Sequence, residues 1–242
     1  MLFLRSLSYQ VVMVVFTLFF APLCLLTFPF PFETRYNFIR RWAQFNLWWL
    51  KMTCGLGYRV SGTENIPPGN AIVFCKHQSV WETLALQEIF PPQVWLLKRE
   101  LLWVPFFGWG LALLEPIAID RKSRREAMRQ LLEQGEKRLR DGRWVVIFPE
   151  GTRVAPGQKK PYQKGGAILA EKTGYPVVPV AHNAGEFWPR RSFIKRPGTI
   201  QLVIGPPIET RGKTYQEINR EAEAWIEGKL AEITTLRDGK SA

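Results

Sequence analysis

FCKHQSVWET, at residues 74–83, joins the end of an apolar run to the start of a helical pattern. The run AIVFC at 71–75 predicts a buried strand, and residues 79–90, which precede two prolines, predict a helix. A strand followed directly by a helix is typical of α/β sheets, in which ligands collect at the carboxyl ends of the strands. The stretch therefore indicates an α/β fold with His77 and Glu82 at a strand end.

The spacing of His77 and Glu82 restricts how they can meet. Five residues on an ideal helix correspond to about 140° of rotation, so His77 must lie in the turn and Glu82 in the first helical turn. Ser79-x-x-Glu82 matches a capping box with Ser79 as the N-cap, which leaves His77 outside the helix. Two interpretations stay open. Glu82 either orients His77 as a general base, or it only caps the helix and His77 is incidental.

The remainder of the chain alternates between strand-like and helical patterns. Strands are predicted at 58–61, 71–75, 93–97, 116–119, 144–148, 177–181 and 199–204, and helices at 79–90, 123–141, 165–172 and 215–236, with an irregular apolar stretch at 101–113. This order predicts one mixed-sheet α/β domain over 57–242, with helices on its faces.

The N-terminal segment differs in composition. Residues 6–32 carry no charge and are long enough to cross a hydrocarbon core of about 30 Å. A single preceding Arg5 and the length of the apolar run argue against a cleaved signal peptide. Three prolines, at positions 22, 29 and 31, leave a full span and a re-entrant segment as alternatives.

Residues 36–54 predict an amphipathic helix. Its aromatic face suits the headgroup region of a membrane, or alternatively packs on the globular domain. With the preceding apolar segment it forms a predicted membrane-associated helical pair over 1–56. By the positive-inside rule, the basic residues that follow the apolar segment predict that the α/β domain lies on the cytoplasmic side of the membrane, which in a bacterium is the inner membrane. These basic residues are Arg35, Arg40, Arg41 and Lys51.

The charge balance favours an anionic partner. The 33 Lys and Arg residues against 21 Asp and Glu give a formal net charge of +12. Acidic lipids and phosphorylated metabolites fit this balance, whereas a nucleic-acid protein is disfavoured because the basic residues are spread out and the apolar leader has no role there. Cys24, Cys54 and Cys75 lack zinc-site spacing, which predicts a reduced domain without metal.

Few side chains can supply a neutral-pH base. Of the two histidines, His182 ends the apolar run VPVAH and is interpreted as structural, so His77 remains. No G-x-S-x-G is present, and Cys75 and Ser79 show no local sign of activation, which disfavours a covalent hydrolase. The GKT at 212–214 lacks a glycine at phosphate-loop distance. The remaining interpretation is that His77 activates a hydroxyl on a substrate.

A second constellation suggests what that substrate carries. The predicted strand at 144–148 runs into PEGTR at 149–153, and a basic loop follows. A glycine turn at a strand end, with an arginine able to hold phosphate through two hydrogen bonds, is typical of an anion site. The alternative is a solvated basic loop. The candidate phosphate-binding residues are Arg121, Glu150, Gly151, Thr152 and Arg153.

In this order the segments resemble the PlsC-type 1-acyl-glycerol-3-phosphate acyltransferases. The family blocks appear here as His77 to Glu82 for H-x4-D, residues 98–101 and 105–108 for K-x-E-L and P-F-x-G, residues 148–153 for the strand and EGTR, and residues 178–180 for V-P-V. The one departure is Glu82, where the family usually has Asp.

The resemblance implies a mechanism. His77, held by Glu82, takes the proton of the sn-2 hydroxyl of lysophosphatidate as that oxygen attacks an acyl thioester of acyl carrier protein or coenzyme A. Lys98 is placed near the developing oxyanion, and the EGTR residues with Arg121 grip the phosphate. Phe106, Phe107 and Trp109 are expected to contact the lipid tail. No metal or bound cofactor is implied.

Two alternatives to lysophosphatidate acylation stay open. One is acylation of another lysolipid, such as a lyso-ornithine lipid. The other is a membrane lipid-binding protein with a degenerate site, which acyl-transfer activity would distinguish from an enzyme.

Overall fold

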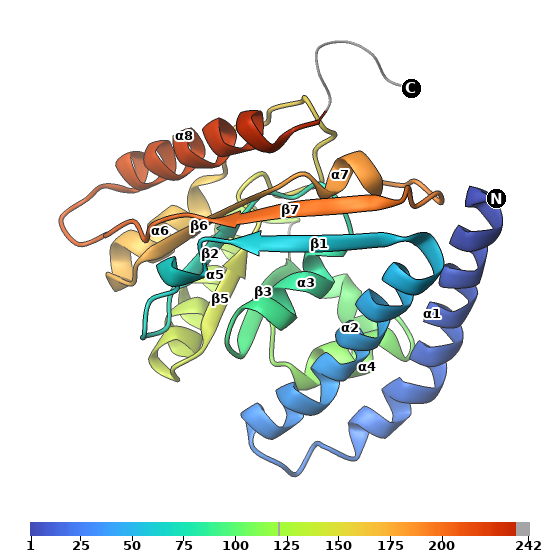
Figure 1. Cartoon of the computed structure of the whole chain (residues 1–242). Coiled ribbons are helices and arrows are strands. Elements are labelled where there is room, and N and C mark those ends of the chain that lie inside the picture. The colour runs from blue at the N-terminus through green and yellow to red at the C-terminus, as the bar shows by residue number, and fades with distance from the viewer. Residues whose placement is uncertain (121, 236–242) are drawn as a thin grey trace.

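Short, nearly continuous apolar runs form the central strands of one sheet, whose two faces each pack in a hydrophobic core (Figure 1). The computed structural model describes residues 1–120 and 122–235. Its strands are β1 (Leu56–Ser61), β2 (Ile72–Cys75), β3 (Gln93–Lys98), β4 (Ile117–Ile119), β5 (Trp144–Ile147), β6 (Val177–His182) and β7 (Gly198–Ile204). The strand order is β1-β7-β6-β2-β5-β3-β4. Only the β6–β7 pairing is antiparallel among these strands, so the predicted mixed sheet is confirmed.

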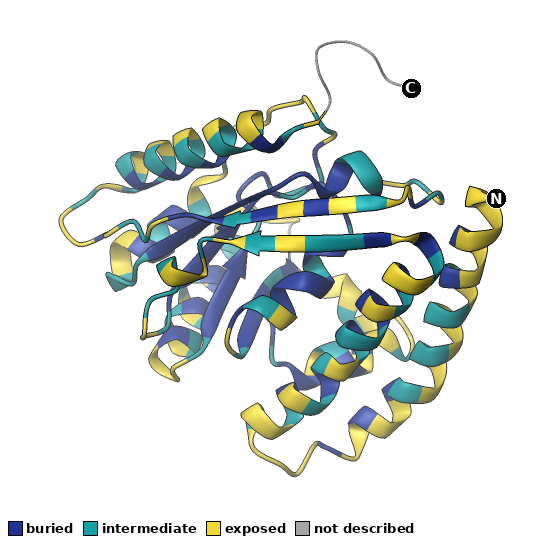
Figure 2. Ribbon diagram, viewed as in Figure 1, coloured by how far each residue is buried: buried dark blue, intermediate teal, exposed yellow. Residues whose placement is uncertain are grey.

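Helices cover both faces of the sheet. They are α1 (Leu2–Leu25), α2 (Phe32–Cys54), α3 (Trp81–Ile89), α4 (Phe107–Leu113), α5 (Arg124–Arg140), α6 (Lys164–Thr173), α7 (Ala184–Phe187) and α8 (Tyr215–Ile233), with short 3-10 helices η1 (Thr63–Asn65) and η2 (Arg99–Trp103). The alternating side chains of β2 show the division between the faces. Val73 belongs to the core shared with α2 and α3, whereas Phe74 belongs to the core shared with α5, α6 and α8. The central strands β2, β5 and β6 are buried, whereas β1, β7 and the outer faces of the helices carry exposed residues (Figure 2).

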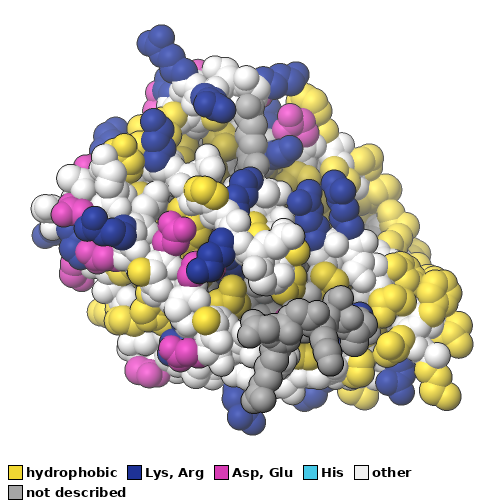
Figure 3. Space-filling view, turned by 90° about the horizontal axis from the view of Figure 1, so that it is seen from above, with side chains coloured by type: hydrophobic (Ala, Val, Ile, Leu, Met, Phe, Trp, Pro, Cys, Tyr) yellow, Lys and Arg dark blue, Asp and Glu magenta, His cyan; other side chains and the backbone are white. Residues whose placement is uncertain are grey.

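The N-terminal pair is confirmed as two helices. Among the described residues, α1 is the one helix long and apolar enough to cross a membrane, and most of its surface is exposed. Hydrophobic side chains gather at the side of the molecule where α1 lies (Figure 3). The predicted aromatic face of α2 turns toward α1: Phe38 stacks on Phe20, and the Trp42 indole donates to Thr17 Oγ1 at 2.8 Å.

The seam of α2 that packs toward the domain is a different one. Tyr36, Ile39, Ala43, Leu47 and Leu50 are buried at spacings of three and four residues. The sequence predicted the amphipathic helix correctly but not which side faces the domain, because two apolar stripes run along it.

The prediction of an irregular stretch at 101–113 is wrong, because η2 and α4 occupy it. Gly108, which lies within this stretch, is a contact residue. A Cβ at Gly108 would lie 2.3 Å from the Leu102 carbonyl oxygen, so only glycine lets η2 approach α4 this closely.

A few helices begin or end at other residues than the sequence predicted. The N-cap of α3 is Val80 and not Ser79, because the helix begins at Trp81. One half of the predicted capping box is present, since the Ser79 amide donates to Glu82 Oε1 at 2.8 Å, and Ser79 Oγ accepts from the Trp81 amide at 3.2 Å. α7 was not predicted. α8 ends at Ile233, and position 236 of the predicted helix lies outside the described residues. The predicted helix at 123–141 is confirmed, with Ser123 as its N-cap.

Candidate functional site

The carboxyl ends of three neighbouring parallel strands meet at one edge of the sheet and carry the candidate residues. β2 leads to His77, β5 leads to the loop at 148–153, and β3 ends at Lys98. Parallel strand ends are where open α/β sheets bind ligands, because loops and helix starts converge there. The sequence segments that carry His77, Lys98 and the EGTR residues therefore lie at one edge of the sheet.

His77 and Glu82 meet as the spacing requires. His77 Nδ1 lies 2.8 Å from Glu82 Oε1, with His77 in the loop and Glu82 in the first turn of α3. The same carboxylate accepts from the amides of Gln78, at 2.9 Å, and Ser79, at 2.8 Å. Glu82 thus contacts both His77 and the backbone at the helix start, so the two interpretations of its role are compatible in geometry.

The protonation pattern follows from these contacts. Burial raises the pKa of Glu82, whereas His182, His77 and the Ser79 amide lower it. The lowering effects are larger, so the pKa of Glu82 lies below its ordinary value. An ionised Glu82 accepts a hydrogen bond from His77 Nδ1, so Nδ1 carries the ring proton. His77 Nε2 is therefore able to accept a proton. The His77 side chain is 14% exposed and stacks on Phe148 at 3.9 Å between ring centroids. The ring is therefore held in place yet remains accessible.

The EGTR loop holds the backbone of His77 on both sides. The His77 amide donates to Glu150 Oε2 at 3.1 Å, and the His77 carbonyl accepts from the Val154 amide at 2.7 Å. Gly151 makes the turn between them with φ of 69°, in the left-handed region that favours glycine. The loop positions His77 as well as contributing side chains to the site.

The placement of Glu150 does not fit the expected contact with substrate phosphate. Its side chain is fully buried, and Oε1 lies 2.9 Å from Nζ of the equally buried Lys76. Burial raises the pKa of Glu150 to about 7, although Lys76 opposes the rise. A carboxylate also repels phosphate. In the structure Glu150 contacts Lys76 and the backbone of His77.

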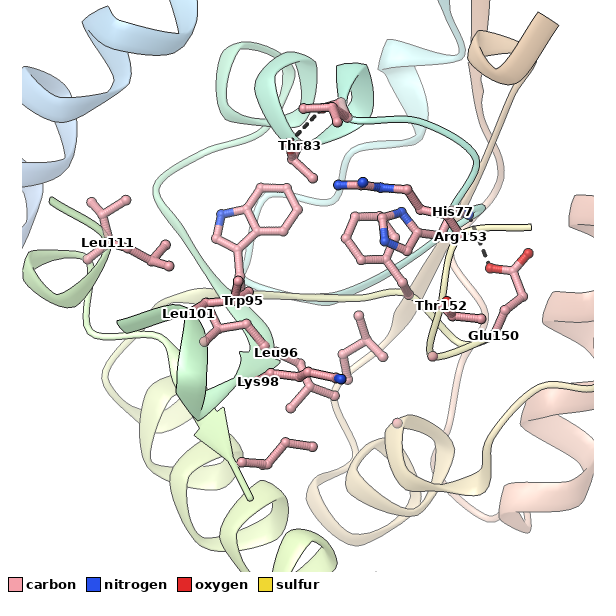
Figure 4. A pocket seen from close by; sticks show the side chains of 18 of the residues that line it. His77, Thr83, Trp95, Leu96, Lys98, Leu101, Leu111, Glu150, Thr152 and Arg153 are labelled. Carbon is pink, nitrogen blue, oxygen red and sulfur yellow. Dashed lines mark hydrogen bonds between the residues drawn. The ribbon is translucent and has the colours of Figure 1, made fainter. Parts of the chain in front are cut away.

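Arg153 and Thr152 lie at the polar end of a cavity of about 1300 Å³ that also exposes His77 (Figure 4). The buried Nε of Arg153 has no hydrogen-bond partner among the described residues. Burial lowers the pKa of Arg153, and Glu82 opposes this. A half-buried guanidinium that lines a cavity and has an unpaired donor is suited to bind an anion. Arg121 lies outside the described residues.

The other end of the cavity is apolar. Its wall is built by α1, α2 and α4, through residues that include Phe20, Ile39 and Leu111. Phe106 and Phe107 contribute to the wall as expected, whereas Trp109 is not among the lining residues. Lys98 extends from the end of β3 into the same cavity (Figure 4). The cavity is thus amphipathic, because His77 shares its lining with both cationic and apolar side chains.

Sequence reasoning missed two residues around this site. Lys76 directly follows the apolar run at 71–75 and belongs to no motif, and neither does Arg190, which lines the cavity. Lys160, from the basic loop that the sequence indicated, also lines the cavity. His182 is buried as expected for a structural residue: its Nε2 lies 2.8 Å from the Lys76 carbonyl, and its Nδ1 accepts from the Ala184 amide.

Comparisons with known proteins agree with this geometry. A sequence model described as "Acyltransferase" matches residues 57–183. The chain is 48% identical over 211 residues to a 1-acyl-sn-glycerol-3-phosphate acyltransferase of Pseudomonas aeruginosa, covering 86% of this chain and 82% of that one. The yeast enzyme of that name, from Saccharomyces cerevisiae, is 33% identical, and the chain spans 59% of its length. The fold is shared with the crystal structure of the 1-acyl-sn-glycerophosphate acyltransferase of Thermotoga maritima, with a TM-score of 0.80, 24% identity and coverage of 98% and 97% of the two chains.

Proposed function

Since the chain belongs to the acyltransferase family, we propose that it transfers an acyl chain from a thioester to the sn-2 hydroxyl of lysophosphatidate. The observation that carries the proposal is the position of His77, whose proton-accepting Nε2 faces a cavity with Arg153 at one end and apolar helices at the other. A single-chain phospholipid has the same polarity, with its reacting hydroxyl between phosphate and acyl chain.

The proposed step uses His77 as a general base. Nε2 takes the proton of the sn-2 hydroxyl while the hydroxyl oxygen bonds to the thioester carbonyl carbon. When the tetrahedral intermediate collapses, the carbon–sulfur bond breaks and the departing thiolate receives the proton from His77. Lys98, whose ammonium belongs to the same cavity, is proposed to stabilise the oxyanion.

The acyl donor is a thioester that the reaction consumes. We propose no metal or bound cofactor, because the thioester already supplies an activated acyl group and His77 supplies the base. Rates measured in parallel with acyl-coenzyme A and with acyl carrier protein identify which donor the enzyme uses.

Arg153 is proposed to bind the phosphate. In lysophosphatidate only the sn-2 carbon, the sn-3 carbon and one ester oxygen separate the reacting hydroxyl from phosphorus, so the phosphate must lie near His77. Replacing Arg153 by alanine is expected to raise KM for lysophosphatidate about 10- to 100-fold, since a hydrogen bond to a charged group contributes about 1.5–3 kcal/mol. Steady-state kinetics on the purified protein measure this change.

Two comparisons make the Arg153 experiment specific. Monoacylglycerol has no phosphate, so the variant should lose most of the preference for lysophosphatidate over monoacylglycerol. Arg220→Ala, at an exposed position of α8, is the matched control and should behave as wild type. An unchanged KM in Arg153→Ala removes Arg153 from phosphate binding.

We also propose that α1 and α2 attach the protein to the inner membrane of a bacterium, with the sheet domain on the cytoplasmic side. Support comes from the exposed apolar surface of α1 and from the basic residues of α2, including Arg40 and Arg41. The aromatic contacts between α1 and α2 let the pair enter the bilayer as a unit, and the cavity wall formed by these helices gives lipid tails a short path to His77.

Replacing Phe19, which is 73% exposed on α1, by glutamate tests this attachment. The variant should bind anionic phospholipid vesicles at least about tenfold more weakly, because a charge in hydrocarbon costs about 2.5–3.5 kcal/mol. Activity on a short-chain lysophosphatidate below its micelle concentration should persist. Gln216→Glu, exposed on α8, is the control. Equal vesicle binding by wild type and Phe19→Glu would argue that this face of α1 lies outside the membrane.

A further inference from the structure

We propose that Lys76 is a positioning residue for acyl transfer, because its buried ammonium joins the C-terminal helix α8 to the carboxylate that holds the backbone of His77. The proposal rests on the acyl-transfer function above. It extends the active site to a helix beyond the residues matched by the family model, which end at 183.

The contacts form a continuous chain. Glu227 of α8 accepts from Lys76 Nζ at 2.5 Å, and Lys76 Nζ lies 2.9 Å from Glu150 Oε1. The second oxygen of Glu150 accepts from the His77 amide at 3.1 Å. Each group in the chain therefore fixes the next, from α8 to the backbone of the proposed base.

Burial makes the pairing of these charges necessary. The side chains of Lys76 and Glu150 are 0% exposed and that of Glu227 is 10% exposed. Burial disfavours the charged form of Lys76, but Glu150 and Glu227 outweigh it and raise the Lys76 pKa. An ionised Lys76 in turn opposes the rise of the Glu150 pKa. Lys76 thus keeps Glu150 available as an anionic acceptor for the His77 amide.

Lys76 does not contact the substrate. The lining of the large cavity includes His77 and Glu150 but neither Lys76 nor Glu227. A residue of this kind should affect kcat with little effect on KM, since it changes the placement of the base and not the hold on the phosphate.

Replacing Lys76 by methionine tests the proposal. At pH 7 kcat should fall about 10²-fold, the loss typical of a misplacement of about 1 Å, with KM for lysophosphatidate unchanged within about twofold. Without the ammonium the Glu150 pKa rises further, and Glu150 is ionised only above its pKa. The acid limb of the kcat profile should therefore move to higher pH, which a general loss of stability does not cause.

Other groups facing Lys76 must be considered in reading that profile. Glu150, Glu227 and His182 interact electrostatically with Lys76. Cys75 and Tyr162 interact with Glu150, and Glu223 interacts with Tyr162. Glu150→Gln cannot ionise, so the shifted acid limb should be absent in the Lys76→Met/Glu150→Gln protein. If the shifted acid limb of the kcat profile persists in the double variant, another group causes the shift, and the proposed role of Glu150 is overturned.

A second variant and a spectroscopic measurement cover poor folding of Lys76→Met. Glu227→Gln weakens the hold on Lys76 without removing a buried cation, and should lower kcat about 3- to 10-fold. Lys213→Met breaks the partly exposed Lys213–Glu221 pair and should match wild type. The chain has two histidines, so the ring NMR signals of His77 are assignable by comparison with His77→Ala.

The NMR signals separate the two proposals. Altered or multiple His77 ring signals in Glu227→Gln support positioning even if the wild type transfers no acyl chain, in which case only the proposed function fails. Unchanged His77 signals together with unchanged kcat in Glu227→Gln overturn the positioning role.

Discussion

Replacing His77 by alanine is expected to lower kcat for acyl transfer to lysophosphatidate about 10²- to 10⁴-fold, the usual contribution of a general base. KM should change little, because the cationic end of the cavity, at Arg153, is built by a separate loop. The fall in kcat should exceed that of Lys76→Met, since His77 accepts the proton itself while Lys76 acts through it. Radiolabelled acyl transfer with purified protein measures both constants.

Lipid binding is the control for this experiment. His77→Ala should keep the vesicle binding and the thermal transition of the wild type, because the imidazole is partly exposed and contacts few residues beyond Glu82 and Phe148. If wild type and variant were equally inactive while both bound lipid, the chain would be a lipid-binding protein with a degenerate site.

The fold was largely predictable because its strands and helices carry strong local signals. β2 and β5 are short apolar runs bounded by turn residues, and α5 has Ser123 at its start and Gly142 after its end. The positions of His77 and Glu82 were also predictable, because five residues of separation allow contact only across a loop-to-helix junction.

The role of Glu150 was not predictable, because it depends on partners distant in sequence. Lys76 lies 74 residues before Glu150 and Glu227 lies 151 residues after Lys76. A glutamate in a glycine turn that also carries an arginine resembles part of an anion site, and only the fold reveals that its carboxylate pairs with a buried cation, Lys76. The side of α2 that faces the domain was uncertain for a related reason, since α1 covers one of its two apolar stripes.

The second large effect is expected from Glu82→Gln, which should lower kcat about 10²- to 10⁴-fold. The carboxylate of Glu82 accepts from His77 Nδ1 and from the amides of Gln78 and Ser79. A glutamine has one acceptor oxygen, and its NH₂ group faces donors, so it cannot keep the imidazole and the helix start satisfied together. The negative charge that favours protonated His77 during the reaction is lost as well.

Glu82→Asp separates reach from charge. Aspartate keeps the charge but is one methylene shorter, so it cannot hold both the 2.8 Å contact to His77 and the contacts to the loop amides unless α3 shifts. A fall in kcat of about tenfold is expected, smaller than for glutamine, because the charge remains while the ring is less well placed. The family resemblance makes this variant informative, since aspartate is the usual residue there and its surroundings in this chain are built around the longer side chain.

The same variants decide between orientation of His77 and helix capping. If Glu82 only caps α3, both substitutions should lower the melting temperature while kcat per folded molecule stays near wild type. If Glu82 orients the base, kcat should fall at temperatures where circular dichroism shows a folded protein, and the loss should be larger for glutamine than for aspartate. Glu88→Gln, on the same helix but with its partner Gln44 at the surface, should change neither quantity. Because Glu82 makes both sets of contacts, the expected outcome is a fall in both quantities, with the larger effect on kcat.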